Sequence, residues 1–385
     1  MKKTYFIILC LIIFISGCTK SPELPKNYEA NSVEWHDNDF LVYHAKDGLY
    51  AYQTSNGTTK KLLSEELSGF NWNIIDFNSK YYGSSLDGSK YILSTGKRHI
   101  LQIYEANTDK IIKTITLNDP NDEIYEAGWF DNENIFLATR FTLYLANVIS
   151  GEQVRITEDS FDLISQLDKS IGDYIWWVKD VYKIGDQLYY NGVRSFTDQI
   201  SSTIYYNDKL NEQKLLEKAI LLKVVDDQRF IYLKQSDNGY EGTFLYNIQT
   251  GESFLIAKED LRNTGGIFLT NDSKLAFVTM STDSTPYFGV IFDPVTLQAE
   301  IFEMFKNSSN IVKTNLFGQF MGAFENNGGY VFLIGGYQYN SKTNKLTQVE
   351  GYESKKGINM QISPSGKYIV IDDNNLFDVI RSDNL

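Results

Sequence analysis

A six-residue pattern recurs along this chain and predicts where one strand ends and the next begins. It consists of a residue that is usually aromatic, a polar residue, three further residues and a residue suited to a turn. Gly, Asn and Asp tolerate the positive φ that tight reversals require, so each copy predicts a β-hairpin whose first strand ends on a buried side chain. Leu297, which ends one of the weaker copies, is the poorest turn residue. The strong copies are 52–57, 104–109, 206–211, 246–251 and 339–344, and the weaker ones are 146–151, 292–297 and 377–382.

A second pattern precedes the first in each repeat. A polar turn, such as Asp87-Gly88 or Asp226-Asp227, comes before a short run of β-branched and aromatic residues. Such runs predict strands, so each repeat has two hairpins and four strands. The runs lie at 40–43, 91–93, 135–137, 188–190, 230–233, 275–278, 330–333 and 368–371.

Eight of these units follow one another from Tyr52 to Phe377 at an average spacing of about 46 residues. Four-stranded units at this period are typical of β-propeller blades. The prediction is an all-β propeller of eight blades, with seven as the alternative. The last unit has three strands at 358–381, so a segment near 28–33 is expected to supply the fourth and close the ring, because an open propeller leaves unpaired edges.

One repeat carries a more specific motif. Residues 362–369, Ile-Ser-Pro-Ser-Gly-Lys-Tyr-Ile, and more weakly residues 85–92, Ser-Leu-Asp-Gly-Ser-Lys-Tyr-Ile, resemble the WD40-like or TolB-type propeller repeats of exported bacterial proteins. The resemblance implies the same fold. It implies no particular activity, because propellers host many functions.

Two stretches depart from the repeat. Phe161, Ile164, Leu167 and Ile171 have helical spacing, which predicts an excursion with a short helix before Trp176 and Trp177. The two tryptophans fit either a blade strand with one ring buried or an exposed aromatic patch for a partner. Residues 215–225 fit either a helix or the strand–loop–strand that the repeat favours.

The first residues have the order of an export signal. Lys2 and Lys3 precede an apolar run at 5–15, about half the length of a membrane-spanning helix. Ile15-Ser16-Gly17-Cys18 then resembles the bacterial lipobox, with Ile in place of the more usual Leu. That resemblance implies cleavage before Cys18, diacylglycerol on its sulfur and a further acyl chain, such as palmitate, on its amine. Two or three chains make a stable anchor.

These features divide the chain into a cleaved signal peptide (1–17), a lipidated cysteine with a flexible tether (18–31) and the propeller (32–385). Cys10 lies in the signal, so the mature chain has one cysteine and no internal disulfide. The expected location is extracytoplasmic, on the cell membrane, or on the outer membrane if the host has two.

The charge balance excludes some partners. Removing Lys2 and Lys3 from the 36 basic residues leaves 34 against 49 acidic ones, a net charge of −15. Such a surface repels phosphate backbones, so nucleic acid is not an expected partner. Membrane contact is expected through the lipid on Cys18.

No catalytic or metal-binding set is predicted. His36 and His44, the ends of one predicted strand, would lie roughly 26 Å apart at ~3.3 Å per residue, and His99 is remote in sequence, so no zinc site is expected. No Gly-x-Ser-x-Gly elbow, phosphate loop or dinucleotide fingerprint occurs, so no cofactor is expected. Acidic clusters are read as turns: Asp119, Asp122 and Glu123; Asp226 and Asp227; Asp372 and Asp373.

We therefore expect a lipid-anchored binding or scaffold module for a protein, peptide or envelope polymer. The alternative is an enzyme of lyase or glycosidase type that uses acidic residues near the propeller axis. A pair of carboxylates facing one pocket would favour the alternative.

Overall fold

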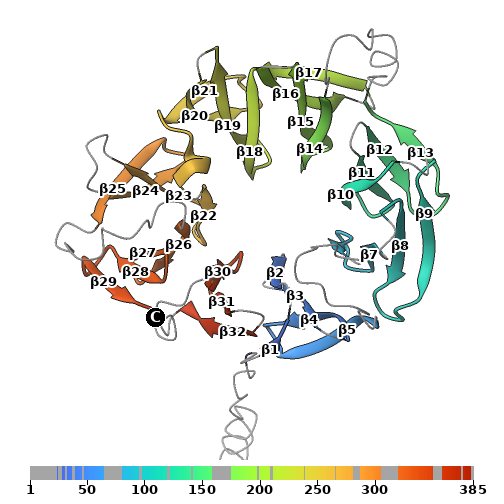
Figure 1. Ribbon diagram of the computed structural model, residues 1–385, viewed down its shortest axis with the longest axis horizontal. Coiled ribbons are helices and arrows are strands. Elements are labelled where there is room, and N and C mark those ends of the chain that lie inside the picture. The colour runs from blue at the N-terminus through green and yellow to red at the C-terminus, as the bar shows by residue number, and fades with distance from the viewer. Residues whose placement is uncertain are drawn as a thin grey trace, which may run out of the picture.

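The computed structural model shows a ring of eight sheets around a common axis (Figure 1). Each sheet has four antiparallel strands, so the predicted propeller is confirmed with eight blades. Within the described residues no helix is long and apolar enough to cross a membrane. The described residues are 24, 28–30, 33–36, 40–45, 47–64, 80–94, 98–118, 122–139, 142–157, 175–196, 199–208, 211–237, 239–264, 266–280, 287–304, 320–349, 358–373 and 376–382.

Consecutive strands pair within each blade, from an inner strand to an outer one. Blades 1 to 4 are β2–β5 (Val33–His36, Phe40–Ala45, Gly48–Gln53, Thr58–Ser64), β6–β9 (Tyr81–Ser84, Lys90–Ser94, Ile100–Glu105, Ile111–Thr116), β10–β13 (Ile124–Trp129, Asn134–Thr139, Leu143–Asn147, Gln153–Arg155) and β14–β17 (Ile175–Ile184, Gln187–Phe196, Gln199–Asp208, Asn211–Glu217). Blades 5 to 7 are β18–β21 (Ala219–Asp226, Arg229–Ser236, Gly239–Asn247, Ser253–Ala257), β22–β25 (Phe268–Leu269, Leu275–Met280, Tyr287–Asp293, Gln298–Met304) and β26–β29 (Phe320–Asn326, Gly329–Ile334, Tyr337–Asn340, Lys345–Gln348). A short 3-10 helix, η2 (Leu261–Thr264), precedes β22.

Both ends of the chain build blade 8. Strands β30 (Ile358–Ile362), β31 (Tyr368–Asp373) and β32 (Leu376–Arg381) are completed by β1 (Tyr28–Glu29), which pairs with β32. The predicted closure is therefore confirmed. Because β1 lies inside the range predicted to be tether, the propeller starts before residue 32.

The polar second position of the repeated pattern has a direct structural role. The Asn147 side chain accepts hydrogen bonds from the backbone N–H groups of Ile149 and Ser150, at 3.0 and 2.9 Å, and its carbonyl accepts one from Gly151. Asn247, Asp293 and Asn340 accept the same pair of side-chain bonds in their own blades. In each turn the side-chain oxygen therefore accepts hydrogen bonds from backbone N–H groups that have no partner in the sheet.

Two copies of the pattern, 206–211 and 377–382, do not form the predicted turn, whereas the copy that ends at Leu297 does. In the copy 377–382, Phe377 is the second residue of β32, and that strand continues to Arg381. Leu297, the poorest turn residue, still ends the same turn with φ +58°, and its N–H donates to the Asp293 carbonyl at 2.9 Å. Asn211 is not a turn residue: it is the first residue of β17 and pairs with Asp208, so two residues connect β16 and β17. A long hairpin closed by a short loop therefore replaces the four-residue turn in blade 4.

The turn at Leu297 gives a stability prediction. A branched side chain in the left-handed region costs about 1–2 kcal/mol, and Asn tolerates that region better. Leu297→Asn should therefore raise the free energy of unfolding in urea by about 1 kcal/mol, since Leu297 is 42% exposed and loses little packing. Val295→Asn, in the same turn and 71% exposed, is the control and should change stability by less than about 0.5 kcal/mol. Equal shifts in both variants would contradict the strain argument.

The motif at 85–92 has two structural counterparts. Ser85 donates to Asp87 at 2.7 Å while Gly88 adopts φ +69°, and Thr270 donates to Asp272 at 2.6 Å while Ser273 adopts φ +63°. Ser363 and Gly366 form the third such turn. The copy at Thr270 has no glycine, which hides it in the sequence.

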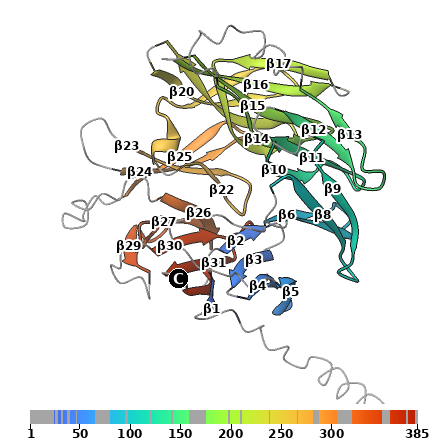
Figure 2. The same cartoon turned by 45° about the vertical axis from the view of Figure 1, so that its right-hand side comes forward.

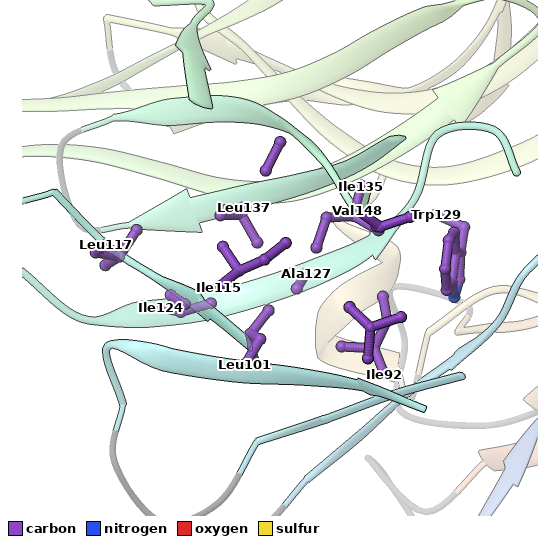
Figure 3. Close-up of a cluster of buried hydrophobic side chains, with 12 residues drawn as sticks. Ile92, Leu101, Ile115, Leu117, Ile124, Ala127, Trp129, Ile135, Leu137 and Val148 are labelled. Atoms are coloured by element: carbon purple, nitrogen blue, oxygen red, sulfur yellow. The ribbon is translucent and has the colours of Figure 1, made fainter. Parts of the chain in front are cut away.

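Among the residues that the structure describes, buried hydrophobic side chains form eight clusters, one between each pair of neighbouring blades. Figure 3 shows one of them, where Ile92 and Leu101 of blade 2 meet Ala127, Trp129 and Ile135 of blade 3. A single four-stranded blade buries neither face alone, so each blade depends on both neighbours.

The meander gives the ring two different faces. Turns between the first and second strands and between the third and fourth lie on one face. Connections between the second and third strands, and from one blade to the next, lie on the other face. Figure 2 turns the ring so that the blades β6–β9 and β10–β13 come forward.

Candidate functional site

Charged side chains on the inner strands gather in blades 3 to 5. Glu126 lies on β10, Asp180 on β14 and Lys223 on β18. Inner strands of a propeller are mostly covered by their neighbours, so charges there need partners or a ligand.

A β-bulge places Asp180. The pairing of β14 with β15 shifts between Lys179 and Tyr182, and Asp180 adopts φ +52°. Its carboxylate accepts a hydrogen bond from Asn191 Nδ2 at 2.9 Å. A bulge turns one side chain away from the regular alternation, and such irregularities are frequent next to functional sites.

Asn191 fixes this arrangement to the next blade. Its side chain is fully buried, donates to the Leu221 carbonyl at 2.9 Å and accepts from the Leu221 N–H at 2.7 Å. One amide thus joins β15, the β14 bulge and β18.

Glu126 supports the bulge from the other side. Its carboxylate accepts the Val181 N–H at 3.1 Å. Burial, and to a lesser degree the nearby negative charge of Asp180, raises the pKa of Glu126, while the Val181 N–H counteracts that rise.

The bulge borders a pocket of about 370 Å³ between the inner ends of blades 4 and 5 and the segment that leads into blade 6. This volume is within the range of small-ligand sites. The strand β18 also has an irregular register here, between Leu221 and Lys223. The lining consists of Asp180, Tyr182, Ile220, Leu221, Leu222, Lys223, Arg262, Gly266 and Ile267.

Three polar side chains of the pocket have distinct environments. The Tyr182 hydroxyl donates to the Leu222 carbonyl at 3.2 Å, and burial raises the pKa of Tyr182 to about 12. The Arg262 guanidinium is held by Asp260 at 2.7 Å and lies 5.3 Å from the Tyr240 ring. The Lys223 ammonium lies 6.0 Å from the Phe268 ring, and burial lowers the pKa of Lys223.

A second groove, of about 490 Å³, lies between the outer turns of blades 5 and 6. Phe254, Val295 and Leu297 expose apolar surface in it, and Arg229 at its edge pairs with Asp226 at 2.6 Å. Asn247 in its lining caps the turn of its own hairpin, and Ser253 accepts a hydrogen bond from the Tyr232 hydroxyl at 2.9 Å.

The residues singled out from the sequence lie elsewhere. Cys18 and the helix expected at 161–171 are outside the described residues. Trp176 and Trp177 belong to β14, opposite Arg194 and Val193, but their side chains are outside what is described.

The histidine prediction was partly wrong. His36 ends β2 and His44 lies on β3, so they are on neighbouring strands rather than at the ends of one. Burial lowers the pKa of His44 to about 4. Among the described residues no three His, Cys, Asp or Glu side chains are grouped to hold a metal ion.

Asp372 and Asp373 are the last two residues of strand β31, so their prediction as a turn was wrong. Glu123 pairs with Arg98 at 2.9 Å, and Asp226 pairs with Arg229. The strand–loop–strand alternative for residues 215–225 is confirmed by β17 and β18, which are separated by Lys218 at φ +51°.

Sequence reasoning missed Asp180, Lys223 and Arg262. Lys223 had a usable signal, because it is the one charge in the apolar run 219–225. Asp180 and Arg262 had none, since a bulge and a 3-10 helix bring them to the pocket.

Comparison with known proteins gives the fold and no family. No protein-family model matches the chain, and no curated protein matches it. Among solved structures, the Dos1 propeller matches with a TM-score of 0.55 and 12% identity over 93% of both chains. Dipeptidyl peptidase 4 of Porphyromonas gingivalis matches with a TM-score of 0.57 and 9% identity, over 94% of this chain and 59% of that one. A putative dipeptidyl aminopeptidase IV of Bacteroides ovatus matches with a TM-score of 0.53 and 11% identity, over 94% and 59%. At these identities the likeness concerns the fold alone, and by that fold the chain is a β-propeller of eight four-stranded blades.

Proposed function

We propose that this chain is an exported propeller, anchored by lipid on Cys18, that binds a protein, peptide or envelope polymer at the inner ends of blades 4 and 5. The observation that carries the binding role is the 370 Å³ pocket with charged and apolar walls. A pocket of this size with a few convergent polar groups is the usual form of a ligand site.

The pocket favours binding over glycoside chemistry. Hydrolysis of that type needs two carboxyl groups on opposite sides of the reacting bond. Asp180 is the one carboxylate among the described lining residues, and Glu126 lies outside the lining with an oxygen engaged by the Val181 N–H.

One experiment tests anchoring and binding together. Tagged wild-type and Cys18→Ser chains are expressed in a bacterial host and cross-linked in cells, after which membranes are separated. The wild type should sediment with membranes and Cys18→Ser should be soluble, because the lipid is lost. Both should cross-link the same envelope component, and Ile220→Trp, which fills the pocket, should reduce that cross-link at least tenfold.

Two outcomes would contradict the proposal. Cys18→Ser sedimenting with membranes as the wild type does would remove the lipid anchor. A folded Ile220→Trp chain that retains its cross-link would remove the pocket as the binding site. Thermal unfolding of each purified variant gives the folding control.

A further inference from the structure

Lys223 is an unusual lysine for this chain. It interrupts the apolar run of β18, its side chain is mostly buried, and burial is what lowers its pKa. Among the described residues no carboxylate forms an ion pair with it, and the Phe268 ring is its nearest recorded partner. Buried ammonium groups are usually paired, since leaving water costs several kcal/mol per ion.

The acidic composition makes the missing partner more informative. Acidic residues outnumber basic ones by 49 to 36, so a carboxylate partner would be easy to supply. The exposed lysine Lys234 of the same blade has one, Glu241 at 2.6 Å. The pocket instead places Lys223 beside Arg262, whose own charge is matched by Asp260.

Both neighbouring strands are irregular where they meet the pocket. The registers of β14 and β18 shift at Asp180 and at Leu222, and these shifts set which side chains face the cavity. Beside the two cations, the lining contains Asp180, which Asn191 Nδ2 bonds at 2.9 Å, and Tyr182, whose hydroxyl donates to the Leu222 carbonyl. The aliphatic part of the wall is Ile220, Leu222 and Ile267.

We infer that this pocket binds the free carboxylate end of a peptide, with Lys223 as the anion anchor and the aliphatic wall receiving the last side chain. The inference rests on the proposed binding function and names its ligand chemistry. A charge-assisted hydrogen bond from an ammonium to a carboxylate is among the stronger polar contacts. A uronic acid offers the same charge, but it has no apolar side chain to cover Ile220, Leu222 and Ile267.

The test compares matched small probes on the purified chain from residue 19 onward. N-acetyl-Ala-Leu with a free carboxylate, the same dipeptide as its amide, and galacturonic acid are titrated by calorimetry. The free acid should bind at least tenfold more tightly than the amide and than galacturonic acid. Lys223→Met should remove that preference by weakening the acid at least tenfold and leaving the amide unchanged.

Two controls keep the outcome interpretable. Lys223→Met removes an unpaired buried charge, so it should unfold no earlier than the wild type, and Lys234→Met should bind the acid normally. Equal binding of acid and amide, tighter binding of galacturonic acid, or no binding of any probe would overturn the inference. If one of these results is found while Ile220→Trp still reduces the cross-link formed in cells, the proposed binding function stands and only the peptide carboxylate is ruled out as the ligand.

Discussion

An Asn191→Ala variant should lose about 4 kcal/mol of the free energy of unfolding, one of the two largest changes we expect in this molecule. Asn191 is fully buried and satisfies both backbone groups of Leu221, at 2.7 and 2.9 Å, as well as the Asp180 carboxylate. Alanine leaves a buried donor and a buried acceptor unpaired, and each costs about 1–3 kcal/mol.

Urea unfolding followed by tryptophan fluorescence measures this loss. Asn134→Ala is a matched control, because the Asn134 amide bonds Asp131 within a partly exposed turn of its own blade. That variant should lose about 1 kcal/mol or less. An Asn191→Ala chain within 1 kcal/mol of the wild type would show that the blade 4–blade 5 contact does not depend on this amide.

The same region shows where sequence reasoning succeeds and where it stops. Features that depend on neighbouring residues could be predicted from the sequence. The second position of each repeat is polar because, at Asn147, Asn247 and Asp293, the side chain caps the turn of its own hairpin. Eight hairpin pairs then require eight blades, and the three-stranded last unit requires a partner from the other end of the chain.

Features that depend on pairing between strands could not be predicted from the sequence. The bulge at Asp180 depends on how β14 aligns with β15. One extra residue in β14 changes that alignment without altering the apolar pattern of the sequence. Leu297 accepts a left-handed conformation because the surrounding hairpin and the Asp293 side chain fix its turn. The candidate site is therefore built from the irregularities, while the sequence pattern describes the regular scaffold around them.

Removing the closing strand should be the other large change, since it opens the ring. A chain without residues 1–31 lacks β1, so the edge of β32 is unpaired and the cluster between blades 8 and 1 loses Leu24 and Ala30. Loss of this packing and exposure of Phe377, which is now buried, should lower the free energy of unfolding by about 3 kcal/mol.

The comparison is with a chain lacking residues 1–20, which keeps Leu24 and β1 and should unfold at the same temperature as the chain beginning at residue 18. Two hydrogen bonds still join blades 1 and 8 in the chain without residues 1–31. Trp35 Nε1 donates to the Gln361 carbonyl at 3.1 Å, and Gln361 Nε2 donates to the Val33 carbonyl at 3.0 Å. The shortened propeller should therefore remain folded at low temperature and accept a missing strand from outside.

A synthetic peptide of residues 21–32, added in excess, should restore the lost thermal stability, because an exposed sheet edge binds a complementary strand through its main chain. A scrambled peptide of the same composition should have no effect. Unfolding at the same temperature with and without residues 21–31 would mean that the contacts between blades 1 and 8 close the ring without β1. Residues 21–31 would then contribute nothing to ring closure, and the lipid anchor that we propose could be moved to the other end of the chain without loss of stability.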